Sequence, residues 1–323
     1  MLDTSELDLE SFSFASKMRK SPTGKMRHVT EAFRTVLWFH SIRLASRTTS
    51  PSQMDAWLAA RLALSDDARI DRKKQWRSYK YGRHSPSEPL VAAIEPWLPG
   101  SRALFNHPVW QILRIDLKVQ DQLAGLLVLL PPAIYSLVRG NATPDQSHLM
   151  QLDGWDASRL RRLQRQVSLD SLACLIALLR LLAEEGRGAQ AYVFSRAVCR
   201  SLLVMGPWLS SHGIAQPLAD YVERYLLPLG SDRGWQHIFG GGGFLRAAEE
   251  LALAAEVAEW REDEPLDSNQ QADLRLDMLE DRFTIAMSML VRPVPIAGAS
   301  PDPGSERLMM KIFDLQRRVR RRR

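Results

Sequence analysis

Apolar residues along the chain recur mainly at helical spacing. Between Thr30 and Ser46, apolar residues return every three or four positions, which places them on one face of a helix with Thr30 as its expected N-cap. Alternating runs of β-branched residues do not occur, so the predicted fold class is all-α. Further helices are expected at 51–64, 66–81, 86–98, 108–130, 157–185, 189–210, 215–227, 244–261, 270–291 and 306–320.

Two of these helices carry clear start signals. Ser50 is followed by Pro51 and, three residues after the serine, by Gln53, which together are typical of an N-cap, a first-turn proline and a capping-box partner. The segment from Ser85 to Glu88 repeats this arrangement. Gly82 is expected to end the helix between the two signals, because glycine adopts the left-handed conformation that closes helices.

Charge and cysteine content narrow the class of protein. The net charge is +6, and basic residues cluster at 69–83, at 159–165 and at the C-terminal end, a distribution that suits an anionic partner. Cys174 and Cys199 lie in apolar surroundings and are expected to be free, buried thiols. The acidic start of the chain lacks a basic-then-apolar leader, and the apolar stretch 123–138 is too short to span a bilayer, so we expect a cytoplasmic protein.

The helix expected at 66–81 is strongly basic. At 100° per residue, Arg69, Lys73, Arg77 and Lys80 fall within an arc of about 80°, which would let them meet a phosphate backbone or base edges together. The alternative interpretation is a solvated helix face that packs through Trp76 and Tyr79.

The segment from Ser50 to Gly100 resembles the helix-turn-helix of lambda-repressor-like DNA-binding domains. The resemblance is carried by a capped helix, a tight turn, a basic helix and its ending Trp76-Arg77-Ser78-Tyr79-Lys80-Tyr81-Gly82-Arg83, followed by Ser85-Pro86-Ser87. It covers about a sixth of the chain, and the expected turn lacks the family's usual glycine. The resemblance implies DNA contacts by Arg69, Lys73, Lys74, Arg77, Lys80 and Arg83.

The C-terminal end is the second candidate for binding nucleic acid. Six arginines occur among the last eight residues, and guanidinium groups fork onto phosphate oxygens. Contact with an anionic membrane and a tail that only aids solubility are alternatives. The arginines proposed to contact nucleic acid here are Arg317, Arg318, Arg320 and Arg321.

Two further groups of residues have competing interpretations. Trp97, Phe105 and Trp110 suit either a base-stacking platform or a corner of the core. Asp273, Asp277 and Asp281 recur every four residues and suit either a shared divalent cation or a salt-bridged surface, which is favoured. No catalytic, metal or cofactor motif is recognised in the sequence.

These features predict four regions: a flexible arm at 1–28, a helix-turn-helix-like module at 29–115, a larger irregular helical domain at 116–300, and a basic C-terminal helix and tail at 301–323. The predicted function is non-catalytic nucleic-acid binding, with duplex DNA favoured and a regulator as the expected type of protein. The alternative is a structural or adaptor subunit of a larger bacterial protein or ribonucleoprotein assembly. Partner subunits or a homo-oligomer fit either hypothesis, and an enzyme of unknown chemistry ranks third.

Overall fold

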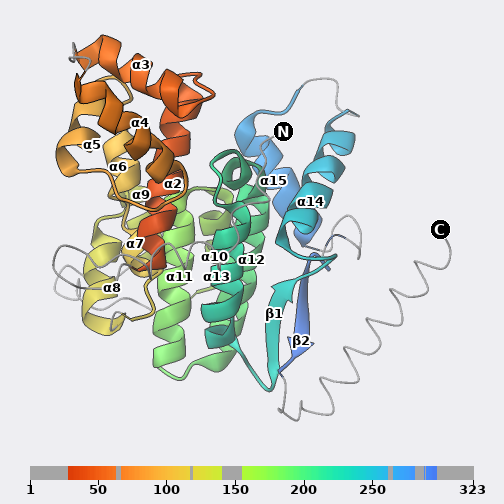
Figure 1. Cartoon of the computed structure of the whole chain (residues 1–323). Coiled ribbons are helices and arrows are strands. Elements are labelled where there is room, and N and C mark those ends of the chain that lie inside the picture. Colours follow the sequence, from red (N-terminus) through yellow and green to blue (C-terminus); the bar gives the residue numbers. More distant parts are fainter. Residues whose placement is uncertain are drawn as a thin grey trace. The chain divides into compact units, whose positions relative to one another are not determined.

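The computed structural model describes residues 28–62, 67–116, 119–139, 155–260, 265–280, 287 and 289–296. They form helices joined by short connections and one two-stranded sheet (Figure 1). The predicted all-α class is confirmed in its main feature, to which this small sheet is added.

The chain divides into two compact units. Unit 1 comprises the residues up to Arg114 together with Trp208–Asp220, and unit 2 comprises Ile115–Pro207 and the residues from Tyr221 onward. Helices α12 (Gly188–Ser211) and α13 (Ala215–Tyr225) each cross a boundary between the units. The two units are described separately below.

Unit 1 is built around an aromatic core. The Trp38 ring lies 6.0 Å from the Trp76 ring in a nearly parallel arrangement, and Tyr79 and Phe105 meet Trp38 edge-on. All four side chains are buried, so these contacts join α2, α4 and α6. The described helices that lie wholly in unit 1 are α2 (Val29–Ala45), α3 (Pro51–Leu62), α4 (Asp67–Lys80), α5 (Glu88–Ile94), α6 (Ser101–Phe105) and α7 (Val109–Ile112).

Unit 2 is organised around α11 (Leu169–Glu184), whose side chains are buried on nearly every face. The sheet pairs β1 (Trp235–Phe239) with β2 (Val291–Pro295) in antiparallel register, with Phe239 opposite Val291. Throughout the described ranges, no helix has both the length and the apolar character required to cross a membrane. The other elements are α8 (Val119–Val128), α9 (Pro132–Arg139), α10 (Ala157–Arg165), the 3-10 turn η2 (Leu227–Gly230), α14 (Phe244–Glu259) and α15 (Ser268–Leu279).

Two predicted helix starts are corrected. The cap of α2 is His28, whose Nδ1 accepts a hydrogen bond from the Thr30 backbone amide, so Thr30 lies inside the helix. The cap of α5 is Ser87 rather than Ser85, and a proline occupies the first turn. At α2 the His28 side chain serves an exposed amide of the first turn, whereas Ser87 makes no side-chain cap hydrogen bond at α5.

Two predicted long helices are interrupted. The helix expected at 108–130 is the short α7 followed by α8, and the Trp110 indole N–H donates to the Leu104 carbonyl, which holds α7 against the preceding turn. The helix expected at 157–185 breaks at Val167, whose φ is +28°. Ser168 then starts α11 with a reciprocal capping box to Ser171, and this cap stabilises the break.

The helix expected at 270–291 is interrupted after Leu279 and does not reach 291, and residues 281–286 and 288 lie outside the described ranges. Helix α15 ends there, and Val291–Pro295 forms strand β2. Strand β2 contains two prolines, which an edge strand tolerates because one side of its backbone needs no partner. Pairing with β1, more than fifty residues away along the chain, decides this conformation.

The prediction of free, buried cysteines is confirmed. Cys174 and Cys199 are fully buried and form no disulfide, and burial raises the pKa of both thiols because it penalises the thiolate. We therefore expect Ellman's reagent to leave both thiols unmodified in the native chain and to modify both after denaturation. A chain with the exposed Ser136→Cys substitution is the control and should react rapidly at one thiol. Rapid native reaction of the unsubstituted chain would contradict the burial.

Candidate nucleic-acid interface

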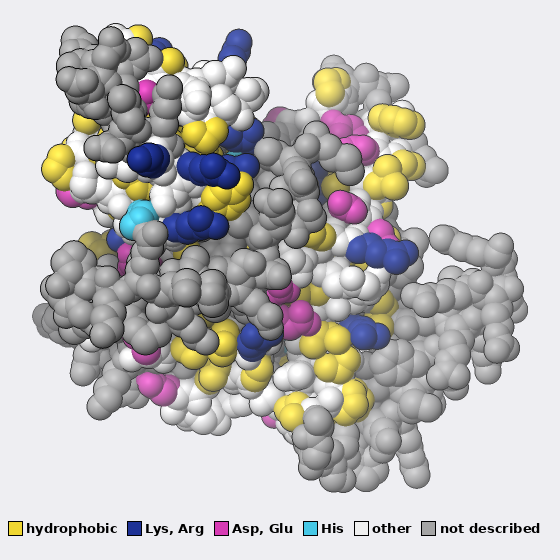
Figure 2. Space-filling view, viewed as in Figure 1, with side chains coloured by type: hydrophobic (Ala, Val, Ile, Leu, Met, Phe, Trp, Pro, Cys, Tyr) yellow, Lys and Arg dark blue, Asp and Glu magenta, His cyan; other side chains and the backbone are white. Residues whose placement is uncertain are grey.

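A groove on unit 1 brings the start of α3 to the second half of α4. Its volume is about 440 Å³, and we name it the basic groove. Figure 2 shows Lys and Arg side chains gathered over this part of unit 1. The groove is lined by Pro51, Ser52, Lys74, Arg77, Lys80 and Tyr81.

The start of α3 forms one end of the groove, and its cap is the one predicted. The Gln53 amide donates to Ser50 Oγ at 3.2 Å, and the Thr49 amide donates to Gln53 Oε1 at 2.7 Å. Pro51 fills the first turn and Ser52 is exposed. The partial positive charge of a helix N-terminus therefore faces the groove, which favours an anion there.

Burial of the opposite side of α4 explains why its cations face the groove. Trp76 and Tyr79 are 1% and 5% exposed, respectively, and anchor α4 in the aromatic core. Arg77 follows Trp76 by 100° around the helix, so it points away from the core and is exposed. Lys80 lies only about 40° from Trp76 and is half-buried. Helix α4 therefore packs into the core through Trp76 and Tyr79, and the same helix still exposes a basic face.

Tyr81, directly after α4, makes cation–π contacts with two basic side chains. The Lys80 ammonium lies 5.1 Å from the centre of the Tyr81 ring, and the Arg83 guanidinium lies 5.4 Å from it. Gly82 ends the helix as predicted, with φ of +60°. A Cβ there would lie 2.9 Å from the Cβ of Ala32, so a larger residue would push this turn away from α2.

The cations of the groove are not neutralised by described carboxylates. Each ion pair between residues of the described ranges joins other groups, and none includes Lys74, Arg77, Lys80 or Arg83. Lys74, Arg77 and Arg83 are exposed. The groove therefore combines several cations with a helix N-terminus, an arrangement that suits phosphate oxygens.

The structure covers only part of the predicted site. It brings Lys74, Arg77 and Lys80 together at the groove and places Arg83 just beyond it. Arg69 and Lys73 belong to α4, but their side chains are not among those described. The connection 63–66 also lies outside the described residues, and so does the tail with Arg317, Arg318, Arg320 and Arg321. Ser52 and Tyr81 also line the groove and are not among the residues predicted from the sequence, although the Ser50-Pro51-Gln53 signal locates the start of α3.

The aromatic platform proposed from sequence is not formed. Phe105 and Trp110 are each 3% exposed and belong to the core, which confirms the alternative of a core corner for these two. Trp97 is 47% exposed. The Arg61 guanidinium lies 5.7 Å from the Trp97 ring centre and 4.1 Å from that of Trp57. Trp97 is thus a surface residue supported by an arginine.

Two arginines of the basic cluster at 159–165 pair with carboxylates of α15 and its C-cap residue. Arg161 pairs with Asp277 and Glu280, and Arg165 pairs with Asp273 at 3.1 Å. The predicted salt-bridged acidic face is confirmed for Asp273 and Asp277, while Asp281 lies outside the described residues. In the described part of the chain, no group of three potential metal-ligating side chains occurs.

One buried serine and histidine in unit 2 lie at hydrogen-bonding distance. Ser195 Oγ is 2.8 Å from His237 Nδ1, and the same hydroxyl donates its proton to the Tyr192 carbonyl. With that proton committed, His237 Nδ1 must be the donor to Ser195 Oγ. A histidine that donates to a serine does not activate it as a nucleophile. The pair therefore has the geometry of a structural contact.

Comparison of the chain with protein-family models, with curated proteins and with solved structures gives no match.

Proposed function

We propose that the protein binds nucleic acid through the basic groove of unit 1, with duplex DNA as the favoured partner. The carrying observation is the meeting of Lys74, Arg77 and Lys80 with the N-terminus of α3 in one groove. Phosphates of a nucleic acid backbone would accept hydrogen bonds from these groups, and release of counterions would add to the affinity.

The groups of the groove would have different tasks. Arg77 can fork onto two phosphate oxygens, whereas Lys74 and Lys80 act as point charges. Ser52 can donate from its backbone amide or its hydroxyl. Such contacts position a protein on the backbone and carry no direct information on sequence.

The helix-turn-helix resemblance is part of this proposal. In it, α4 is the recognition helix, α3 is the helix before it, and Arg69 and Lys73 on the first half of α4 reach toward the bases. The arginines at 317–321 would add nonspecific contacts to phosphate. A regulator of this kind would act in the cytoplasm.

The test compares two double variants by fluorescence anisotropy with a labelled duplex over a series of salt concentrations. Lys74→Gln with Arg77→Gln should weaken duplex binding by roughly tenfold or more at low salt and lower the slope of log K against log salt by about 2, since each lost phosphate contact contributes about 0.9. The matched control, Arg224→Gln with Arg292→Gln, removes the same charge from exposed positions of unit 2 and should bind like the unsubstituted chain.

Equal affinity and equal salt slope for the two double variants would overturn the groove as the binding site. A chain ending at Gln316 separates the groove from the arginine tail, because binding through the groove survives the truncation. Single-stranded DNA and RNA serve as competitors in the same assay. Tighter binding of either would replace duplex DNA as the favoured partner.

A further inference from the structure

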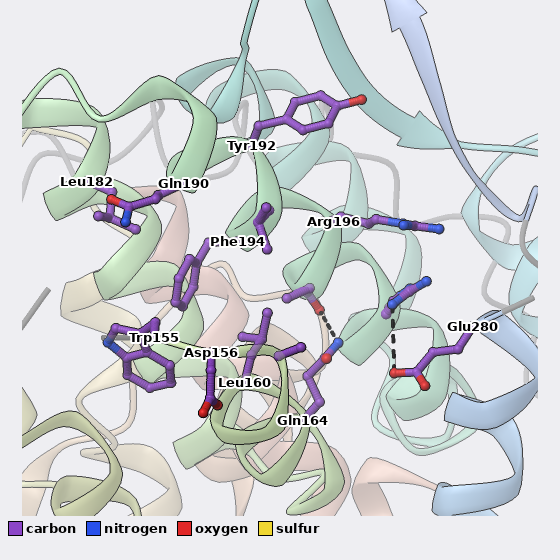
Figure 3. A pocket seen from close by; sticks show the side chains of 14 residues that line it. Trp155, Asp156, Leu160, Gln164, Leu182, Gln190, Tyr192, Phe194, Arg196 and Glu280 are labelled. Carbon is purple, nitrogen blue, oxygen red and sulfur yellow. Dashed lines mark hydrogen bonds and ion pairs between the residues drawn. The ribbon is translucent and has the colours of Figure 1, made fainter. Parts of the chain in front are cut away.

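Unit 2 contains a cavity of about 350 Å³ that the nucleic-acid proposal does not use. Trp155 and Phe194 form one wall, Arg196 points away from this wall, and Asp156 and Glu280 also line the cavity (Figure 3). These charges of opposite sign do not converge on one ligand group. Helix α14, in the same unit, instead presents a continuous exposed face.

The exposed face of α14 carries an apolar stripe. Leu253, Val257 and Trp260 are 62%, 44% and 83% exposed, respectively. Their spacing of four and then three residues places them within an arc of about 60°, and we name them the α14 stripe. Phe244 and Leu251, on the opposite side of the helix, are buried and anchor it in the core. A tryptophan as exposed as Trp260 is typical of an interaction surface.

Carboxylates border the α14 stripe. Glu249 and Glu256 are exposed, and at 100° per residue both fall within about 70° of the middle of the stripe. Glu249 takes part in none of the ion pairs formed within the described ranges, and Glu256 also acts on Arg275 of α15. Arg246, the basic residue of α14, already pairs with Glu250 at 3.1 Å. Figure 2 shows hydrophobic and acidic side chains together over the region of α14, so this face suits a basic amphipathic partner.

The C-terminal segment 306–323 of the same chain has the matching pattern. A helix is expected from its sequence at 306–320, and its apolar residues repeat the spacing of the α14 stripe, four and then three residues apart. They are Leu308, Ile312, Leu315 and Val319. Helices with this spacing pack side by side with their stripes facing each other. Lys311, Arg318 and Arg322 border the apolar residues of the segment, so its charge is complementary to that of α14.

The connection to this segment is long enough to reach the α14 stripe. Strand β2 starts beside Phe239, close to the start of α14, and runs away from it along β1 for five residues, or about 17 Å (Figure 1). Residues 297–305 span about 30 Å when extended. Returning along the hairpin leaves about 13 Å, which equals about nine residues of helical rise on α14. The segment can therefore begin beside Leu253.

We propose that the C-terminal segment 306–323 docks on the α14 stripe of its own chain. Leu308, Ile312 and Leu315 pack on the stripe, and the basic residues beside them pair with Glu249 and Glu256. The α14 stripe belongs to unit 2 and the basic groove to unit 1, so this proposal does not depend on nucleic-acid binding by the groove.

Hydrogen exchange of the full chain, measured by mass spectrometry, tests this docking. An isolated helix of this length is only marginally stable in water, so its amides exchange almost as fast as those of an unfolded peptide. In the full chain, the amides of residues 308–319 should exchange at least roughly tenfold more slowly than in a free peptide of residues 306–323. Exchange at the rate of the free peptide would overturn the proposal.

Two double variants assign the docking to α14. Leu253→Lys with Val257→Lys removes apolar contacts and repels the basic segment, so exchange of residues 308–319 should rise to the rate of the free peptide. The matched control, Val128→Lys with Leu129→Lys, changes two exposed apolar residues elsewhere in unit 2 and should leave that rate unchanged. The amides of α14 should keep their protection in both variants, because all four positions are exposed. Equal exchange of residues 308–319 in the two variants would overturn the proposal.

Charge and concentration identify the occupant further. Glu249→Gln with Glu256→Gln should speed exchange of the segment several-fold at low salt and less at high salt, because salt screens exposed charges. An unchanged rate at low salt would overturn the pairing with these carboxylates. Docking within one chain does not depend on protein concentration, so protection that is lost on dilution would assign the segment to the α14 stripe of a second copy and overturn the intrachain proposal.

Discussion

Replacement of Trp76 by alanine is expected to lower the free energy of unfolding of unit 1 by about 3 to 5 kcal/mol, the usual cost of removing a large buried aromatic side chain. Trp76 is 1% exposed, stacks on Trp38 at 6.0 Å, and contacts Tyr79 and Phe39 at ring distances of 5.7 and 6.3 Å. Its removal would leave a cavity between α2 and α4, the helix that carries the basic groove.

Hydrogen exchange measured by mass spectrometry checks this result in unit 1, because amides of α2 and α4 should lose protection first. Trp76→Phe keeps a stacked ring and removes an indole N–H that has no hydrogen-bond partner, so a cost below about 1.5 kcal/mol is expected. Trp260→Ala is the surface control, since Trp260 is 83% exposed, and should change stability by less than about 0.5 kcal/mol. Unchanged protection of α2 in Trp76→Ala would contradict the proposed role of the aromatic core.

Acid is expected to destabilise each unit through one buried histidine. Burial, assisted by Arg43, His212 and Lys80, lowers the pKa of His40 to about 3, and burial with Arg196 and Arg200 lowers that of His237 to about 3. The unfolded chain takes up a proton at each ring below about pH 6.5, whereas the native ring stays neutral until about pH 3. Stability is therefore full above pH 6.5 and falls as the pH drops through this window.

The size of the acid effect follows from the same pKa values. At about pH 4.5, each histidine should cost on the order of 2 to 3 kcal/mol relative to neutral pH. Urea unfolding at both pH values measures it. His237→Asn keeps a donor toward Ser195 Oγ but does not titrate, so its pH dependence in unit 2 should be flatter than that of the unsubstituted chain. His40→Gln should do the same in unit 1. Identical pH dependence in variant and unsubstituted chains would show that these rings do not resist protonation.

Local sequence predicted the start of α3 and the end of α4 well because their signals are local. The cap at Ser50 and the stop at Gly82 act on their own turns, so α3 and the end of α4 lie where they were expected. The wrong prediction of a helix reaching residue 291 has a distant cause. Strand β2 depends on pairing with β1, and no short window of sequence contains both partners.

The candidate site was predicted only in part, because its residues come from separate helices. The sequence shows the type and spacing of the α4 cations and predicts the start of α3. Their meeting in one groove depends on the burial of Trp76 and Tyr79, which turns Arg77 outward. The cluster at 159–165 has a similar composition, yet Asp273, Asp277 and Glu280 pair with two of its arginines, Arg161 and Arg165. Sequence composition does not distinguish a paired arginine from an unpaired one.

The sequence by itself determined the helical class, the buried free cysteines, the caps and stops of several helices, and the positions of the basic residues. These properties follow from short-range hydrogen bonding and from the periodicity of apolar residues. Only the tertiary structure decided which cations stay unpaired, which aromatic rings enter the core, and that the apolar stripe of α14 faces outward. Each of these outcomes depends on side chains from separate helices, whose packing is a property of the whole unit rather than of any segment.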